Sequence, residues 1–192
     1  MEKKIEYFDN TGKENTEKTF QLVKESLEAN HIKKLVLAST TGSSAKQAME
    51  FFKDTDVQLI AVPHQYDFSN KTNRFSRELA EEMRSRGHEV HFGTMLFHTD
   101  KLFGSGIPTT VANFLRCFSE GFKVCYEIVL MASDAGLLAT GEQVIAVAGT
   151  SSGSDTALVM QAGSSQSLKN LRVNEIICKP LNTYVPAEQN QA

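Results

Sequence analysis

A cluster of small hydroxyl residues around a glycine is the part of this chain best suited to bind a ligand. The cluster follows an apolar run that ends at Ala38 and precedes a helix-permissive stretch that begins at Ala45. A strand, a tight loop and a helix start in that order present backbone N–H groups and the positive end of a helix dipole to an anion, most commonly a phosphate. The alternative is a group of helix-capping residues, since Ser and Thr cap helices anyway. Because the cluster exceeds what a cap needs, we expect an anion site formed by Ser39, Thr40, Thr41, Gly42, Ser43 and Ser44.

A second loop of small residues has the same character. It lies between two apolar runs and consists of Gly149, Thr150, Ser151, Ser152 and Gly153, with Asp155 close behind. The pattern G-x-S-x-G also marks the nucleophile of serine hydrolases, which needs a helix after it and a later His. Here a strand-like run follows, and no His comes after His98, so we do not expect a hydrolase. The loop is expected either to face a ligand at close range, which its glycines permit, or to be an ordinary hairpin turn.

Two histidines and a threonine stand where they could complete such a site. His64 directly follows an apolar run, and Thr94 and His98 lie in a long irregular segment after the next one. Ligands of open α/β sheets bind at the carboxyl ends of strands, so each is a candidate to contact a phosphate or a carbonyl. The alternative is that they are exposed loop residues without a role. His88 and His91 should point to opposite sides of a strand, so we expect no metal site, and no residue stands out as catalytic.

The composition is typical of one compact soluble domain, because 41% of the 192 residues are hydrophobic and only 22% are charged. A formal net charge of −3 without a basic stripe gives no reason to expect a nucleic-acid partner. The longest apolar stretch, residues 128–132, is too short to span a bilayer, and no signal peptide is visible at the N-terminus. Cys117, Cys125 and Cys178 have no paired spacing and are expected as small core residues in a reducing compartment. We therefore expect a cytoplasmic protein without a membrane partner.

Apolar runs alternate with helical patterns along most of the chain. Strands are expected at residues 5–8, 34–38, 57–62, 89–92, 143–148, 156–160 and 172–178, and helices at residues 14–30, 45–52 and 74–86. This alternation predicts a three-layer α/β/α fold around a mostly parallel sheet. The connection between 143–148 and 156–160 is too short for a parallel crossover, so we expect an antiparallel strand near the C-terminus. We interpret residues 1–183 as a single domain and residues 184–192 as a polar tail.

Two segments depart from this alternation. Residues 93–109 form a long irregular segment, and such segments in compact domains are usually lids or binding loops. Residues 110–138 are helical in pattern, with an interruption at Gly121 and apolar positions at a spacing of three or four residues that include Val111, Leu115 and Phe118.

Charged residues share another face of this long helix: Arg116, Glu120, Lys123, Glu127 and Asp134. The favoured interpretation is a solvated face with ion pairs between residues four apart. The alternative is that this face lines a ligand cleft or a subunit interface.

Taken together, these motifs resemble the C-terminal domain of pyruvate kinase, and more closely a group of stand-alone proteins that share the fold of that domain. The resemblance rests on residues 35–45, 57–63 and 144–153, the last followed by an antiparallel strand, and it covers most of the chain. The long stretch from residues 108–113 through residues 129–136 resembles the stand-alone group in particular. In pyruvate kinase the two small-residue loops hold an allosteric sugar bisphosphate. The barrel domain that transfers the phosphoryl group has no counterpart in this sequence, so the resemblance does not imply kinase activity.

The second loop departs from the effector-binding pattern of pyruvate kinase. Thr150 and Ser151 stand where that pattern has a Trp-Arg pair, so a second phosphate would lack its bidentate partner. The resemblance therefore implies a monophosphate with an uncharged body. The stand-alone relatives are associated with flavin mononucleotide (FMN), which has that shape. Its phosphate would lie at residues 39–44, and its flat ring could lie against the second loop and residues 95–103.

Three functions follow as expectations. The leading one is that the protein binds a phosphorylated small molecule, FMN by resemblance, at the carboxyl edge of the sheet. The first alternative is an enzyme, either a flavin-dependent oxidoreductase or a phosphosugar-transforming protein, with His64, His98 or Asp155 as the proton donor. The second alternative is a non-catalytic sensor or homo-oligomerisation module, as the domain is in pyruvate kinase, with residues 110–138 at a subunit interface.

Overall fold

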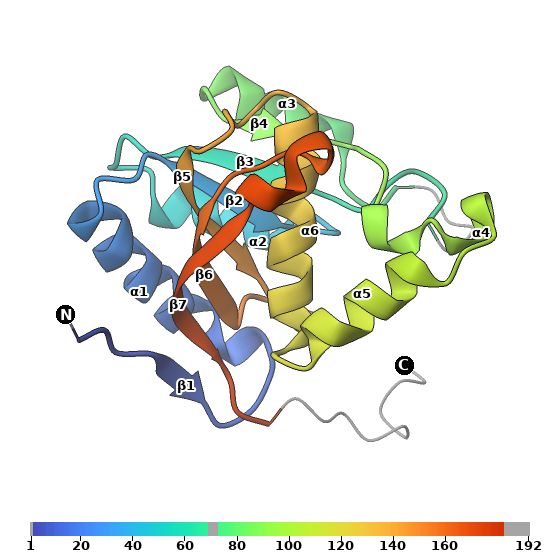
Figure 1. Ribbon diagram of the computed structural model, residues 1–192. Coiled ribbons are helices and arrows are strands. Elements are labelled where there is room, and N and C mark those ends of the chain that lie inside the picture. The colour runs from blue at the N-terminus through green and yellow to red at the C-terminus, as the bar shows by residue number, and fades with distance from the viewer. Residues whose placement is uncertain (1, 69–72, 183–192) are drawn as a thin grey trace.

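A seven-stranded sheet with helices on both faces forms the body of the molecule (Figure 1). The computed structural model describes residues 2–68 and 73–182. The strands are β1 (Glu6–Phe8), β2 (Lys34–Ala38), β3 (Gln58–Val62), β4 (Glu89–Val90), β5 (Gln143–Ala148), β6 (Thr156–Gln161) and β7 (Arg172–Pro180). The α-helices are α1 (Thr16–Ala29), α2 (Ser43–Phe51), α3 (Arg77–Ser85), α4 (Asp100–Phe103), α5 (Ile107–Arg116) and α6 (Glu120–Asp134). Short 3-10 helices include η1 (Lys13–Asn15), η3 (Leu96–His98) and η4 (Ser165–Asn170).

The strands follow the order β1-β7-β6-β5-β2-β3-β4 across the sheet. β2 pairs in parallel with both β3 and β5, β3 pairs in parallel with β4, and β1 pairs in parallel with β7. β6 is antiparallel to both of its neighbours, β5 and β7. The predicted three-layer α/β/α fold, with a mostly parallel sheet and an antiparallel strand near the C-terminus, is confirmed.

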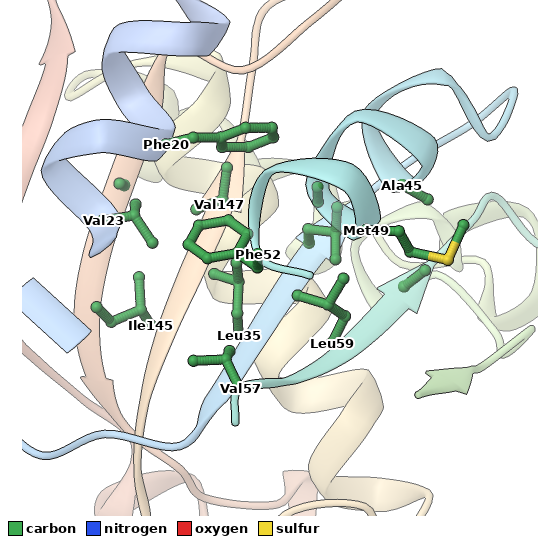
Figure 2. Packing of buried hydrophobic residues seen from close by; sticks show 14 of the residues in the cluster. Phe20, Val23, Leu35, Ala45, Met49, Phe52, Val57, Leu59, Ile145 and Val147 are labelled. Carbon is green, nitrogen blue, oxygen red and sulfur yellow. The ribbon is translucent and has the colours of Figure 1, made fainter. Parts of the chain in front are cut away.

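Side chains alternate between the two faces of the central strands, and both faces are buried. On one face Leu35, Leu59 and Ile145 pack under α1, α2 and α3, together with Phe20 of α1 and Met49 of α2 (Figure 2). Because the central strands are covered on both sides, nearly every residue in them is apolar, which explains the continuous apolar runs in the sequence.

The other face of the sheet packs against α5, α6 and η3. Val36, Ile60 and Ala146 meet Leu115 of α5 and Val129 of α6 there. Figure 1 shows α6 lying across the middle of this face, with α5 leading away from its N-terminal end. The position of α6 matters for the site, because its first turns reach the edge of the sheet where β2 and β5 end.

The long helix predicted over residues 110–138 is two helices, and the interruption predicted at Gly121 was wrong. The chain breaks between α5 and α6, where the Ser119 hydroxyl accepts the N–H of Phe122 and so caps α6. Gly121 lies inside α6 and packs directly on Thr156 of β6, where there is no room for a side chain. The glycine therefore serves close packing between helix and sheet.

The spacing of apolar residues in segment 110–138 predicted only some of the buried positions correctly. Leu115 is buried as expected, whereas Val111 and Phe118 are exposed. Cys125 and Cys178 are core residues, and burial raises the pKa of Cys178 to about 12. Cys117 is exposed, which corrects its assignment to the core.

Some predicted boundaries of secondary-structure elements differ from the observed ones, because the loops contain short helices. The irregular segment 93–109 contains η3, α4 and the start of α5, and the strand predicted at 89–92 ends at Val90. Within the described residues, no helix combines the length and the apolar character needed to cross a membrane. The predicted polar tail, residues 184–192, lies outside the described residues.

Candidate functional site

A cleft of about 660 Å³ opens at the carboxyl ends of β2, β3 and β5. The chain leaves β2 toward β3 on one side, whereas β5 lies on its other side, so the cleft sits where the strand order reverses. Open α/β sheets bind ligands at such a point because the loops after the two central strands diverge there. Both predicted small-residue loops contribute to its walls.

The first loop is shaped by the start of α2. Gly42 has φ of 88° and precedes the first helical residue, and a Cβ at this position would approach the side chain of Leu79 within 2.3 Å. Only glycine suits both conditions. The Ser39 hydroxyl accepts the N–H of Ala45 at 3.1 Å, which leaves the N–H groups of Ser43 and Ser44 in the first turn without an acceptor in the helix. Five hydroxyl residues of this loop line the cleft: Ser39, Thr40, Thr41, Ser43 and Ser44.

The second loop is anchored from behind by Asp155, which is fully buried. Its Oδ2 atom accepts the N–H groups of Thr150 at 3.0 Å and Gly12 at 3.3 Å, and its Oδ1 atom accepts the Thr156 hydroxyl at 2.9 Å. Burial raises the pKa of this carboxyl, and the Thr156 hydrogen bond acts in the opposite direction. Asp155 therefore holds the loop in place.

The tip of the second loop is strained and closely packed. Ser151 has φ of 62°, and the Ser152 N–H donates to the Thr150 carbonyl oxygen at 2.7 Å, which closes a tight three-residue turn. A Cβ at Gly153 would lie 2.4 Å from the Cα atom of Lys13 in η1. The loop is thus pressed against the start of α1 and presents Gly149, Ser151, Ser152 and Gly153 to the cleft.

Most of the predicted site residues line the cleft, and the others lie outside it or behind its walls. The structure brings both loops together with His64 and His98 in one cleft. Four predicted residues do not line it: Gly42, Thr94, Thr150 and Asp155. Gly42 and Asp155 shape the loops that do, while Thr94 is exposed outside the cleft. Whether any of these residues contacts a ligand stays a prediction.

A buried ion pair that the sequence placed on a solvated face lies at the floor of the cleft. Lys123 Nζ is 2.7 Å from Glu127 Oε2, and both side chains are only 2% exposed. The Phe97 N–H donates to Glu127 Oε1 at 2.8 Å, and the ring of Phe97 lies 5.7 Å from the ammonium. The interpretation as a solvated face was therefore wrong for this pair. It holds better for Arg116 and Glu120, a pair that is about one-third exposed.

His98 connects this pair to the cleft. Lys123 Nζ lies 3.1 Å from His98 Nε2, and because an ammonium can only donate, Nε2 must be the acceptor. The ring proton of a neutral His98 is therefore assigned to Nδ1. Burial and then the Lys123 charge lower the pKa of His98, so the imidazole is neutral at pH 7.

His64 lies on the side of the first loop. Its Nε2 atom is 3.3 Å from the Thr40 hydroxyl, and the Phe68 ring packs edge-on against both His64 and His98. Burial lowers the pKa of His64, so this ring is also neutral at pH 7. Both rings can donate a hydrogen bond without adding charge.

Apolar side chains occupy the cleft between its polar ends. They come from β3 and the residues after it, from the segment before η3, and from α6: Val62, Pro63, Phe68, Met95, Val124, Ile128 and Met131. The cleft therefore has hydroxyls and free N–H groups at one end, an apolar middle, and a buried ammonium with a neutral imidazole at its floor. Such a combination is typical of small-molecule sites, and the volume is in their usual range.

Lys123 and Glu127 were missing from the predicted site, although the sequence carried a signal for them. Both lie in a helix whose other residues between 121 and 132 are almost all apolar or aromatic, and a helix that is apolar all round is buried. Lys13 and Arg74 also line the cleft, and nothing in the local sequence pattern distinguishes them from other surface cations.

The comparisons with known proteins bear on the fold and the family. Two solved structures of pyruvate kinase from Cryptosporidium parvum match 72% of this chain. The one determined in complex with ADP is 17% identical with a TM-score of 0.39, and the other is 15% identical with a TM-score of 0.37. The matched region is 22% and 20% of those chains, so this chain spans about a fifth of the pyruvate kinases it matches.

The family model is described as the pyruvate kinase alpha/beta domain, and it matches residues 17–160. That range includes both small-residue loops, β2, β3 and β5, and all but the last residue of the antiparallel strand β6. Since the match covers well over half of the chain, the protein belongs to the family of the pyruvate kinase alpha/beta domain.

Proposed function

We propose that this protein binds a phosphorylated small molecule in the cleft, a phosphomonoester with a flat and largely uncharged body, and that FMN is this ligand. The observation that carries the proposal is the convergence of the α2 N-terminus and two small-residue loops at one end of a cleft whose middle is apolar. The proposal includes a cytoplasmic location, in keeping with the buried free thiols of Cys125 and Cys178.

The phosphate would be held at the first loop. The N–H groups of Ser43 and Ser44 and the hydroxyls around them surround the positive end of the α2 dipole. Lys13 and Arg74 add positive charge to the walls of the cleft. One phosphate dianion matches this end, because no second cluster of free N–H groups and hydroxyls with an Arg partner lies among the cleft residues that the structure describes.

The rest of the cleft fits the ring system of FMN. The apolar side chains between the ends, Met95, Ile128 and Met131 among them, suit a planar aromatic body. Lys123 and His98 offer donors to the polar carbonyl edge of such a ring. Bound FMN would supply hydride-transfer chemistry.

A titration with two flavins tests the phosphate part of the proposal. FMN should quench or change its fluorescence on binding, whereas riboflavin, which lacks the phosphate, should bind at least about tenfold more weakly. Ser43→Asp should remove this preference, because a carboxylate in the first turn of α2 repels the phosphate. The same substitution should leave the fold intact, since an acidic residue there stabilises the helix by about 0.3–1 kcal/mol.

Ser43→Asn is the matched control, because it has the size of the Asp variant without its charge. It should retain the preference for FMN over riboflavin. Equal binding of FMN and riboflavin by the unmodified protein would show that the first loop is not a phosphate site. Unchanged FMN affinity in Ser43→Asp would lead to the same conclusion.

An enzyme is the second candidate, and one observation favours it. His98, Lys123 and Glu127 form a hydrogen-bonded chain that reaches the cleft and carries transferable protons. An oxidoreductase would bleach bound FMN on addition of a reduced nicotinamide and show turnover. A phosphosugar-transforming enzyme would convert a sugar phosphate without flavin. A binding protein would do neither.

A further inference from the structure

Among the residues that the structure describes, the four most exposed large apolar side chains belong to α4 and α5. Leu102, Phe103, Ile107 and Phe114 are 71%, 72%, 70% and 67% exposed. Val111 and Phe118 are 40% and 42% exposed. We call these six residues the α4–α5 face. Figure 1 shows both helices on the outside of the molecule, beyond α6 and away from the sheet.

The α4–α5 face is not needed to hold α5 on the protein. Ala112 and Leu115 on the opposite side of α5 are buried in the core beside α6. The hydroxyl and N–H of Thr109 bind the Asp100 carboxylate, which fixes α4 to the first turn of α5. A helix already anchored by its inner side has no structural use for an outer row of large apolar residues.

The size of the face is that of a dimer interface. Fully exposed side chains of this kind present roughly 150–250 Å² each, so at the observed exposures the six leave on the order of 600 Å² of apolar surface. That is at the upper end of the roughly 300–600 Å² found for the largest patch on ordinary monomers. A standard interface buries about 800 Å² on each partner, about 65% of it apolar in homodimers. This face alone would therefore supply the apolar part of such an interface.

The spacing of the residues selects a second copy of the same chain. Ile107, Val111 and Phe114 lie on α5, and Phe118 lies in the turn just after it, where the Phe118 N–H donates to the Leu115 carbonyl oxygen. These four residues follow one another at intervals of four, three and four, which is the spacing of one side of a helix. The intervals read the same from both ends. Two copies of α5 packed antiparallel about a twofold axis would place Val111 of one copy against Phe114 of the other, and Ile107 against Phe118. In each of these contacts an aliphatic side chain faces an aromatic ring.

The charges around α5 argue in the same direction. The chain carries no charged residue from Ile107 to Leu115, and Arg116 is engaged with Glu120 and Asn113. On α4, Asp100 is bound by Thr109, which leaves Lys101 as the exposed charge beside Leu102 and Phe103. A partner recognised by several charges would therefore find few of them here. A helix lying on a membrane surface usually carries Lys and Arg along its polar side, and the other side of α5 is buried in the core. Depletion of charge is typical of the core of homodimer interfaces.

We propose that the α4–α5 face is a homodimer interface in which α5 packs antiparallel on α5 of a second copy. This inference does not depend on what the cleft binds. Sedimentation of the unmodified protein should give twice the 21.2 kDa of one chain. Phe114→Lys and Val111→Glu should each be monomeric, because each buries two charges against apolar partners. Leu168→Glu, which changes an exposed Leu of η4 at the far end of α6, should remain dimeric.

Mixing the variants tests the register. Equal amounts of Phe114→Lys and Val111→Glu should form a mixed dimer, since the twofold arrangement places the Lys of one copy against the Glu of the other. A mixture of Phe114→Lys and Phe118→Glu should stay monomeric, because these positions do not face each other. Circular dichroism of each variant verifies that these surface changes leave the fold intact.

Several outcomes would overturn the proposal. They are a monomeric unmodified protein, a dimer that neither charged variant disrupts, and equal rescue by both mixtures. A monomer that floats with phosphatidylcholine vesicles would assign the face to a lipid surface instead.

Discussion

At the scale of single residues, the floor of the cleft depends on two opposite charges that are both almost fully buried. A buried ion pair adds little to stability as a pair, because the cost of removing two charges from water offsets their attraction. Losing one partner is a different matter, since the remaining charge then has no compensation. Lys123 and Glu127 are in this situation, with His98 and the Phe97 N–H as their further partners.

Lys123→Met should therefore lower the free energy of unfolding by about 3–5 kcal/mol, because it leaves the Glu127 carboxylate buried and unpaired. The double variant Lys123→Met/Glu127→Gln should recover most of this loss, since Gln keeps an acceptor for the Phe97 N–H without the charge. Urea denaturation measures both values.

The exposed pair on the same helix provides the control. Arg116→Met breaks a partly solvated contact with Glu120 and should cost less than about 1 kcal/mol. Equal losses in the single variant Lys123→Met and in the double variant would contradict the explanation, because the cost would then come from packing.

At the scale of secondary-structure elements, the sequence predicted what depends on local pattern. Continuous apolar runs predicted β2, β3 and β5, because strands in a sheet that is covered on both faces are apolar throughout. The short connection at residues 149–155 predicted that β6 is antiparallel to β5. The two small-residue loops were placed at one edge by the same topology. The spacing of the charges could not reveal which of them would be buried, because a pair four residues apart looks the same on a solvated helix and at a cleft floor. Only the apolar residues around Lys123 and Glu127 pointed to burial.

The break between α5 and α6 shows another limit of local pattern. Gly121 is the expected place for an interruption, yet its reason lies across the molecule, in the close approach of Thr156. Similarly, Val111 and Phe118 have the spacing of core residues, and only the tertiary structure shows that Ala112 and Leu115 take that role. Long-range packing decides such cases, and no single sequence window contains it.

Gly121→Ala is a test of this packing. In an ordinary helix the change would stabilise the protein by about 1 kcal/mol, because Ala is the better helix former. Here the added methyl group would lie 2.3 Å from the Thr156 hydroxyl oxygen, so we expect destabilisation by about 1–3 kcal/mol from overpacking. Thermal unfolding provides the measurement. Gly106→Ala, at the N-cap of α5 with open space and negative φ, should cost only the loss of a better cap residue, about 1 kcal/mol or less. A stabilising Gly121→Ala would contradict the model of close contact.

At the scale of the whole molecule, imidazoles at several places make stability depend on pH. Burial lowers the pKa of His64, His88, His91 and His98 below the ordinary value of 6.5. The folded protein therefore binds fewer protons than the unfolded chain just below pH 6.5. The stability that these neutral rings contribute is complete above pH 6.5 and is lost as the pH falls toward their folded-state pKa values.

In urea unfolding, the free energy of unfolding should thus decrease as the pH is lowered from about 7.5 to about 5.5. The variant His98→Gln removes one lowered pKa and should reduce this slope. The carboxyl of Asp155 has the opposite effect at lower pH: because its pKa is raised on folding, its contribution to the free energy of unfolding increases as the pH falls. A flat profile across this range, or an unchanged slope in His98→Gln, would show that the histidines do not control it.

The pairing of β1 with β7 joins the two ends of the described chain, and it has a consequence for synthesis. Glu6 lies opposite Cys178, and Gly12, a few residues after β1, donates its N–H to the carboxylate that anchors the second loop. A ribosome releases β1 first and β7 last. We therefore expect a nascent chain to carry β1 without its neighbour until translation has passed Pro180, so the wall of the cleft that η1 supports is completed only after β7 has left the ribosome.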